Sequence, residues 1–216
     1  MKPYSLVLFD LDGTVADTEL VMVQTMISFI DRYAPTKKTT LNELIKISGP
    51  PLVDTLKQYF PKEDPQQLAK EFAVKAREFY PRFAVAFPGI QSLLSYCKDR
   101  HIPVGIVTSK LRINALFTLE VIGLKDAFPL VISLDEVKKP KPDPEGILLA
   151  LKHFKQLPKH TLFVGDTTYD YFAGKAAGVD TALVTWGFKK FSKEIQPTMW
   201  IDHFDQLKEY VHARKI

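Results

Sequence analysis

Short apolar runs alternate along the chain with longer segments in which apolar residues recur at helical spacing. Each run is mainly apolar and stops at polar residues, as a buried strand of a parallel sheet does. Four clear runs cover residues 5–9, 102–108, 160–166 and 180–185, and two weaker ones cover 128–133 and 198–202. Helical segments cover residues 89–100, 111–123, 144–155 and 169–178. This alternation predicts an α/β fold, a doubly wound, Rossmann-like parallel sheet with right-handed crossovers.

Residues 16–83 break the alternation, because they contain no convincing strand pattern. Amphipathic helical patterns fill this segment at residues 19–34, 50–60 and 65–80. We therefore expect a helical cap domain of residues 16–83, inserted into a core domain of residues 1–15 and 84–216. The insertion leaves the core just after the first strand, where open α/β sheets bind ligands.

Composition narrows the possible functions. Hydrophobic residues make up 46% and charged residues 25% of the 216 positions, as in ordinary globular proteins, and no apolar run is long enough to span a bilayer. The net charge of +4 is small and dispersed, which suits small anions better than nucleic acid. Cys97 is the single cysteine, so we expect a core residue and no internal disulfide. We expect a cytoplasmic protein with neither membrane nor nucleic-acid partners.

Polar side chains follow the predicted strands at the points where the strands end. They are Asp10, Asp12, Thr108, Ser109, Lys110, Asp166 and Asp170. The carboxyl ends of parallel strands meet at one edge of a sheet, so these side chains can converge. Crowded carboxylates repel one another without a cation, and oxygen ligands suit Mg²⁺. The alternative, that each Asp only forms a turn or a helix cap, is favoured for any single one but not for the whole set.

Two further groups could bind an anion at the same edge. Thr108 offers a hydroxyl and nearby backbone N–H groups, although Thr108 or Ser109 could instead cap the helix that begins near Leu111. The loop "KKPKPDPE" at residues 138–145 contains two overlapping Lys-Pro-x-Pro patterns, in which prolines restrict the lysines. The sequence therefore offers Lys141 or Lys139 as a positive charge for a phosphate.

Four segments together resemble the ordered motifs of the haloacid dehalogenase-like hydrolase superfamily. They are "FDLDGT" (9–14), "VTSK" (107–110), "KPDPE" (141–145) and "VGDTTYDYFAGKAAGV" (164–179). The resemblance is to the phosphatase members with a helical cap after the first motif, and it spans the whole chain. Ser109 departs from the Asn that is common in similar phosphatases. Asp12 argues against the dehalogenase branch, and "GDTTYD" differs from the pattern of the sugar-phosphate mutases.

The resemblance implies a role for each carboxylate. Asp10 matches the nucleophile that forms an aspartyl-phosphate, and Asp12 matches the general acid and base. In the family, Mg²⁺ is held by the side chain matching Asp10, the backbone carbonyl matching Asp12, and the side chain matching Asp166. Asp170 matches a supporting acidic position.

The resemblance also implies how the phosphoryl group is held. Thr108 and the lysine of the third motif match groups that bind its oxygens, and Ser109 lies beside them. Lys141 fits the usual register of the motif, with Lys139 as the alternative. In the cap, Gly49 and Pro50 of "SGPPL" match a stretch that meets the active site in phosphoglycolate phosphatase-like and pyrophosphatase-like members.

The expected function is a Mg²⁺-dependent phosphatase for a small phosphorylated metabolite such as phosphoglycolate or pyrophosphate, as a monomer or homodimer. A phosphomutase of the same fold is one alternative. A metabolite-sensing or partner-binding protein without catalysis is the other, although a chain that retains both Asp10 and Asp12 does not favour it.

Overall fold

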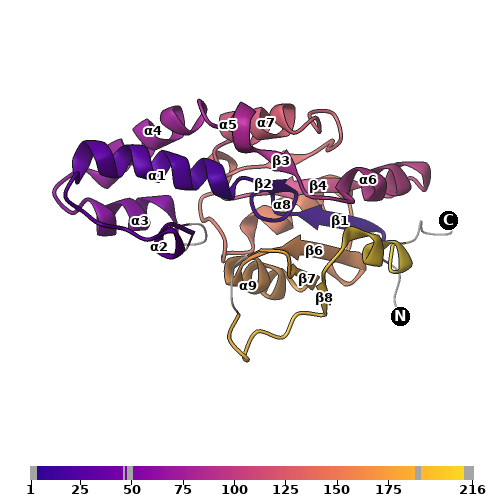
Figure 1. Cartoon of the computed structure of the whole chain (residues 1–216). Coiled ribbons are helices and arrows are strands. Elements are labelled where there is room, and N and C mark those ends of the chain that lie inside the picture. Colours follow the sequence, from indigo (N-terminus) through magenta and orange to yellow (C-terminus); the bar gives the residue numbers. More distant parts are fainter. Residues whose placement is uncertain (1–3, 46, 48–50, 188–190, 212–216) are drawn as a thin grey trace. The chain divides into compact units, whose positions relative to one another are not determined.

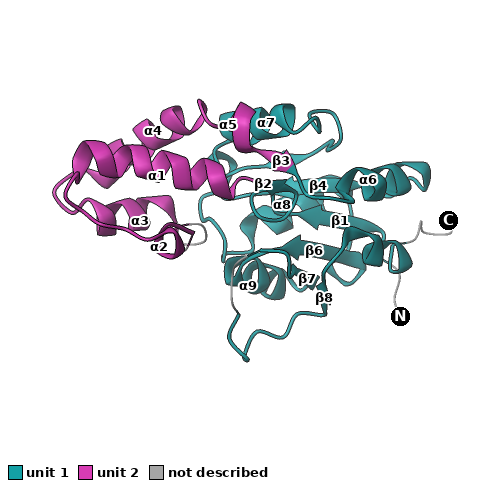
Figure 2. Cartoon of the chain, in the orientation of Figure 1, with its two compact units in different colours: residues 1–16, 86–216 teal, residues 17–85 magenta. Residues whose placement is uncertain are grey.

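The computed structural model of the chain describes residues 4–45, 47, 51–187 and 191–211 (Figure 1). The chain divides into two compact units, one of residues 1–16 with 86–216 and the other of residues 17–85 (Figure 2).

The larger unit contains a six-stranded sheet in which every pairing is parallel. In spatial order its strands are β5 (Val131–Ile132), β4 (Val104–Val107), β1 (Leu6–Phe9), β6 (Thr161–Gly165), β7 (Asp180–Val184) and β8 (Met199–Ile201). The predicted α/β fold with a parallel sheet is confirmed. The first strand lies inside the sheet between β4 and β6, and the strand order reverses beside it, which is where such sheets bind ligands.

Both faces of the sheet are covered, which explains why its strands read as apolar runs rather than as alternating patterns. The helices of this unit are α6 (Ile90–Asp99), α7 (Arg112–Val121), α8 (Glu145–Phe154) and α9 (Thr168–Ala177), with 3₁₀ turns η1 (Leu134–Glu136), η2 (Pro158–His160) and η3 (Phe204–Glu209). Leu6 and Leu8 point to a core cluster that includes side chains of α8 and α9. Phe9 points to the other face, where its ring meets those of Phe128 and Phe204 edge-on at 6.0 and 6.2 Å.

The four helices agree with the four helical segments predicted for this part of the chain. Cys97 of α6 is completely buried, so the prediction that it is a core residue is confirmed. Burial raises the pKa of its thiol to about 11, which keeps the thiolate scarce near neutral pH.

The smaller unit is helical. Its helices are α1 (Glu19–Tyr33), α2 (Leu41–Ile45), α3 (Leu52–Tyr59), α4 (Pro65–Ala76) and α5 (Tyr80–Phe83). Side chains of α1 to α4 form a separate apolar core, in which the Phe29 ring lies 5.2 Å from that of Phe72 and 6.3 Å from that of Phe60. No helix in the described parts of the chain is both long and apolar enough to cross a membrane.

The helix predicted over residues 65–80 ends early, at Ala76. The next three amides bond to carbonyls three residues back, so the chain tightens before α5 begins. Pro81 gives the physical reason, because a proline lacks an N–H and its ring clashes with the carbonyl four residues earlier in a continuous helix.

Two short strands that the sequence pattern did not predict lie at the chain's passages between the units. Strands β2 (Ala16–Asp17) and β3 (Val85–Ala86) pair as a small sheet. A two-residue strand is too short to produce a recognisable alternation, which explains why the pattern missed both.

Candidate active site

The site is built on the turn that follows β1. The Asp10 amide donates to the carbonyl of Val164 at 2.8 Å, which ties the end of β1 to β6. The chain then turns at Gly13, whose φ of +80° favours glycine. A Cβ at Gly13 would overlap the Asp166 carboxylate, so the missing side chain is also what lets this turn lie against β6.

Three carboxylates converge beside this turn. Asp10, Asp166 and Asp170 each offer an oxygen within 4.8 Å of the others, and they are only 7%, 2% and 1% exposed. Asp170 reaches the cluster from the first turn of α9, where it forms a capping box with Thr167. One Asp170 oxygen accepts hydrogen bonds from the Asp166 and Thr167 amides at 3.2 and 2.9 Å, which fixes its position.

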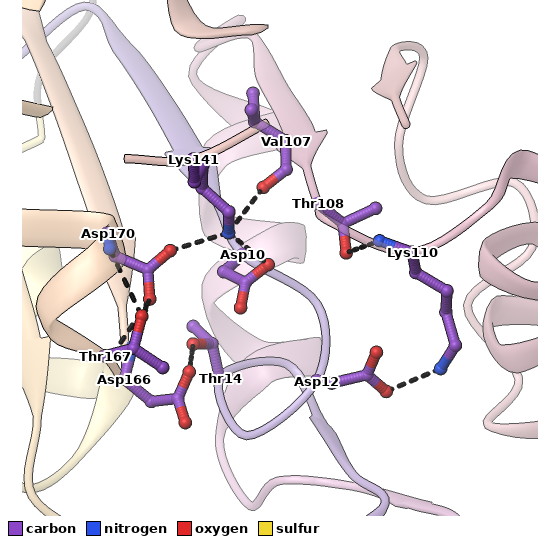
Figure 3. A network of polar contacts seen from close by, with 10 residues as sticks. All are labelled: Asp10, Asp12, Thr14, Val107, Thr108, Lys110, Lys141, Asp166, Thr167 and Asp170. Carbon is purple, nitrogen blue, oxygen red and sulfur yellow. Dashed lines mark hydrogen bonds and ion pairs between the residues drawn. The ribbon is translucent and has the colours of Figure 1, made fainter. Parts of the chain in front are cut away.

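Lys141 joins the cluster from the loop before α8 (Figure 3). Its Nζ lies 2.7 Å from an Asp10 oxygen and 2.6 Å from an Asp170 oxygen, and it donates to the Val107 carbonyl at 3.3 Å. The side chain of the alternative, Lys139, is exposed, and its backbone amide donates to Glu145. Lys141 is therefore the lysine of this loop that contacts the carboxylates.

Burial and mutual charge shift the ionisation of this cluster. Burial, together with the Asp170 and Asp166 charges, raises the pKa of Asp10 to about 7, against the opposing effect of Lys141. Burial alone lowers the pKa of Lys141, but the Asp10 and Asp170 carboxylates outweigh it and raise that pKa above its ordinary value. Three carboxylates beside one ammonium retain excess negative charge, and buried oxygen ligands of this kind fit a hard divalent cation.

Asp12 is held differently from Asp10, although the two are close in sequence. Its carboxylate lies 2.7 Å from Nζ of Lys110 and is absent from the group of three carboxylates described above (Figure 3). Lys110 lies three residues after the end of β4, and its amide donates to the Thr108 hydroxyl at 3.2 Å. The turn after β1 therefore directs its two carboxylates to two separate lysines.

The remaining predicted site residues differ in burial, and two of them cannot be placed. Thr108 is buried at the end of β4, whereas Ser109 beside it is exposed. The cap residue of α7 is Leu111, so the alternative in which Thr108 or Ser109 caps this helix is wrong. Gly49 and Pro50 lie outside the described residues.

The sequence did not predict that Thr14, Thr167 and Lys110 contact the carboxylates of the site. Thr14 donates to Asp166 at 3.4 Å, Thr167 donates to Asp170 at 2.5 Å, and Lys110 pairs with Asp12. All three lie within the recognised motifs, so position in a motif was the available signal. Local pattern could not reveal the partners of Thr14 and Lys110, because Asp166 and Asp12 are distant in sequence. Thr167 and Asp170 are three residues apart, which is the spacing of a capping box.

Comparisons with known proteins agree with this architecture. Residues 7–184 match the family model described as haloacid dehalogenase-like hydrolase. The chain is 34% identical over 202 residues to pyrophosphatase PpaX of Oceanobacillus iheyensis, which covers 91% of each protein.

Solved structures give the same result. A protein from Bacteroides fragilis described as a haloacid dehalogenase-like hydrolase superimposes with a TM-score of 0.85 at 29% identity, covering 94% of this chain and 99% of that one. A Lactobacillus plantarum structure described as a phosphoglycolate phosphatase superimposes with a TM-score of 0.82 at 22% identity, covering 97% and 100%, and this second likeness shows the fold alone. The chain belongs to the haloacid dehalogenase-like hydrolase family.

Proposed function

We propose that this hydrolase is a Mg²⁺-dependent phosphatase whose preferred substrate is inorganic pyrophosphate. The observation that carries the proposal is the buried group of Asp10, Asp166 and Asp170 with Lys141 against it, at the carboxyl ends of β1 and β6. A site with this charge distribution suits a divalent cation together with a phosphoryl group.

The two carboxylates of the β1 turn have different roles in this proposal. Asp10 attacks phosphorus, so that the bond to the leaving oxygen breaks and an aspartyl-phosphate forms. Asp12 gives a proton to the leaving oxygen and later takes one from the water that hydrolyses the aspartyl-phosphate. Their separate positions support this division. Asp10 lies in the buried cluster, whereas the Asp12 side chain is more exposed and lies beside Lys110.

The cation would be held by the Asp10 and Asp166 side chains and the Asp12 backbone carbonyl. When bound, Mg²⁺ offsets negative charge on the phosphoryl oxygens and the carboxylates. Asp170 acts as a support in this proposal, since it accepts from two backbone amides and from Lys141. Thr108, Ser109 and Lys141 contribute donors for the phosphoryl oxygens, with the backbone of the loop after β4 beside them.

The choice of pyrophosphate is supported by the 34% identical relative, which is named for that activity. Phosphoglycolate, which the sequence resemblance implied equally, is the second substrate to test. We also propose that the helical unit of residues 17–85 serves as the cap, with Gly49 and Pro50 in its substrate loop and with motion at the chain's two passages between the units.

The test is phosphate release from pyrophosphate, phosphoglycolate and p-nitrophenyl phosphate, each with Mg²⁺ and with excess EDTA. We expect activity with Mg²⁺, the highest kcat/KM for pyrophosphate, and loss of activity in EDTA and in Asp10→Asn. Wild-type protein without activity, or Asp10→Asn with full activity, would contradict the proposed phosphatase. A higher kcat/KM for phosphoglycolate would contradict only the choice of substrate.

A further inference from the structure

Lys110 contacts the proposed acid and base of the reaction, and neither the motifs nor the charge of the buried cluster explains that contact. Its Nζ lies 2.7 Å from an Asp12 oxygen, whereas the lysine that contacts Asp10 is Lys141. We propose that Lys110 is a positioning residue that orients the Asp12 carboxyl group for proton transfer to the leaving oxygen. The inference rests on the proposed function, because it assigns Lys110 a role in that reaction.

The backbone of Lys110 is held on both sides. Its amide donates to the Thr108 hydroxyl at 3.2 Å, and its carbonyl accepts from the Leu134 amide at 3.0 Å. Thr108 itself is buried, and its amide donates to the carbonyl of Ile132 at 2.9 Å. The Lys110 side chain therefore starts from a fixed point at the sheet edge.

The side chain of Lys110 is also more enclosed than a surface lysine. Its exposed fraction is 13%, compared with 35% for the Asp12 side chain that it contacts. A solvent-exposed ion pair between a lysine and a carboxylate contributes little to stability, because ordering two mobile side chains costs conformational entropy. Here the lysine side chain is already enclosed, so the pair mainly restricts the more exposed partner, Asp12.

Asp12 needs such a restriction because of where it lies. It occupies the turn after β1, and the negative cluster containing Asp10 and Asp166 lies on one side of that turn. Repulsion from the cluster and access to water would both favour rotation of the Asp12 carboxylate away from a substrate. A general acid contributes only when its carboxyl group lies within hydrogen-bond reach of the leaving oxygen. The ammonium of Lys110 gives the Asp12 carboxylate one favoured direction.

Two substrates that differ in their leaving group can distinguish a role of Lys110 in positioning Asp12 from a role in binding the phosphoryl group. The phenolate released from phenyl phosphate needs a proton as it leaves, whereas the 2,4-dinitrophenolate released from 2,4-dinitrophenyl phosphate leaves without one. We expect Lys110→Met, which keeps the length and removes the charge, to lower kcat/KM for phenyl phosphate by about 10-fold to 100-fold, a part of what a general acid contributes. For 2,4-dinitrophenyl phosphate we expect less than about a 2-fold loss, since no proton is transferred in its departure. Lys110→Arg should restore kcat/KM for phenyl phosphate.

A double-mutant cycle tests whether Lys110 acts through Asp12. In an Asp12→Asn background, Lys110→Met should change kcat/KM for phenyl phosphate by less than about 2-fold, because residues in contact are not additive when one acts through the other. Lys98→Met, at an exposed position of α6, is the matched control and should leave both substrates unaffected. Circular dichroism and the melting temperature verify folding, and Lys110→Gln replaces Lys110→Met if that variant does not fold.

Three results would overturn the positioning role. Equal losses of kcat/KM for both substrates would show that Lys110 binds the transferring phosphoryl group directly. Losses that multiply with those of Asp12→Asn would show that the two residues act independently. If the wild-type enzyme is active and Lys110→Met has the same kcat/KM for phenyl phosphate, Lys110 is not needed. A wild-type protein inactive on every substrate would overturn the proposed function, and the role of Lys110 with it.

Discussion

At the scale of residues, Asp10 and Asp12 should fail in different ways when substituted. Asp10→Asn removes the proposed nucleophile, so no protein-bound phosphate should form with any substrate. Asp12→Asn keeps the nucleophile and loses the proton donor and base, so we expect kcat to fall by about 10²-fold to 10⁴-fold. Acid-quenched protein incubated with 2,4-dinitrophenyl phosphate should then carry phosphate in Asp12→Asn, because breakdown of the aspartyl-phosphate is slow.

Release of this phosphate by hydroxylamine would identify an acyl-phosphate, and Asp99→Asn at an exposed site on α6 is the control for nonspecific labelling. Identical loss of both half-reactions in Asp10→Asn and Asp12→Asn would count against the division of roles.

Gly13 is the second residue whose substitution has a specific consequence. An added methyl group would overlap the Asp166 carboxylate, and the φ of +80° would be strained by about 1 kcal/mol in any residue with a Cβ. Gly13→Ala should therefore weaken Mg²⁺ binding as well as stability. The dissociation constant can be measured by calorimetric titration with Mg²⁺.

Gly123 offers a matched control, because its φ is +73° and nothing lies within 4 Å of an added Cβ. Gly123→Ala should lose a similar amount of stability from strain and keep the Mg²⁺ affinity of wild type. Equal affinity in the two variants would mean that the Gly13 contact does not shape the metal site.

The difference between what the sequence did and did not predict is clear at this scale. Asp10, Asp166 and Thr108 could be placed in advance, because each follows an apolar run that becomes a strand and parallel strands end at one edge. The contacts of Lys110 could not be predicted, because a 2.7 Å ion pair between residues 98 positions apart depends on side-chain geometry rather than on spacing.

At the scale of secondary-structure elements, the C-terminal end of α8 provides a test of stability. Lys155 follows this helix with a φ of +52°, a left-handed conformation that suits glycine better than lysine. Lys155→Gly should therefore raise the free energy of unfolding by about 0.5–1 kcal/mol.

Lys152, in the last turn of the same helix, is also exposed, and the same substitution there should have the opposite effect on stability. Lys152→Gly should lower the free energy of unfolding by about 1 kcal/mol, because glycine is a poor helix former. Denaturant titration of the two variants beside wild type measures both changes. A loss of stability in Lys155→Gly would show that the left-handed position is not a source of strain.

Elements that lie in a clear apolar run or carry a helical period could be predicted, and those with neither could not. The strands of the sheet lie within the predicted apolar runs, and α6 to α9 carry apolar residues at helical spacing. Strands β2 and β3 are two residues long, and α2 is five residues long, so none of the three carries a readable period. The early end of α4 results from Pro81, a residue the periodic pattern had passed over.

At the scale of the whole molecule, Mg²⁺ should stabilise the folded protein. A ligand that binds only the native state adds about 2.7 kcal/mol at a concentration of 100 times its dissociation constant. We expect the melting temperature to rise with Mg²⁺ concentration and to fall when EDTA is added. Asp166→Asn should abolish this rise, whereas Asp99→Asn should retain it. A rise of equal size in Asp166→Asn would place the cation elsewhere.

The rise in melting temperature caused by Mg²⁺ should itself depend on pH. The pKa of Asp10 is raised from 3.8 to about 7 in the folded protein, so the native state holds a proton that the unfolded chain releases. Without metal, this carboxyl group should make the protein less stable as pH rises from about 4 to about 7. A cation at the carboxylates opposes that loss, so the Mg²⁺-dependent shift in melting temperature should grow over this range. A shift that shrinks with rising pH would contradict this account of the cluster.

The position of β1 has a consequence for how the protein opens. This strand pairs on both sides, with β4 and with β6, and both of its faces are covered. Its amide hydrogens should therefore exchange with solvent only through the rarest opening, that of the whole sheet. Asp10 is attached directly to this strand, so thermal fluctuations at the periphery can occur without displacing it. The proposed nucleophile then keeps its place for as long as the sheet itself persists.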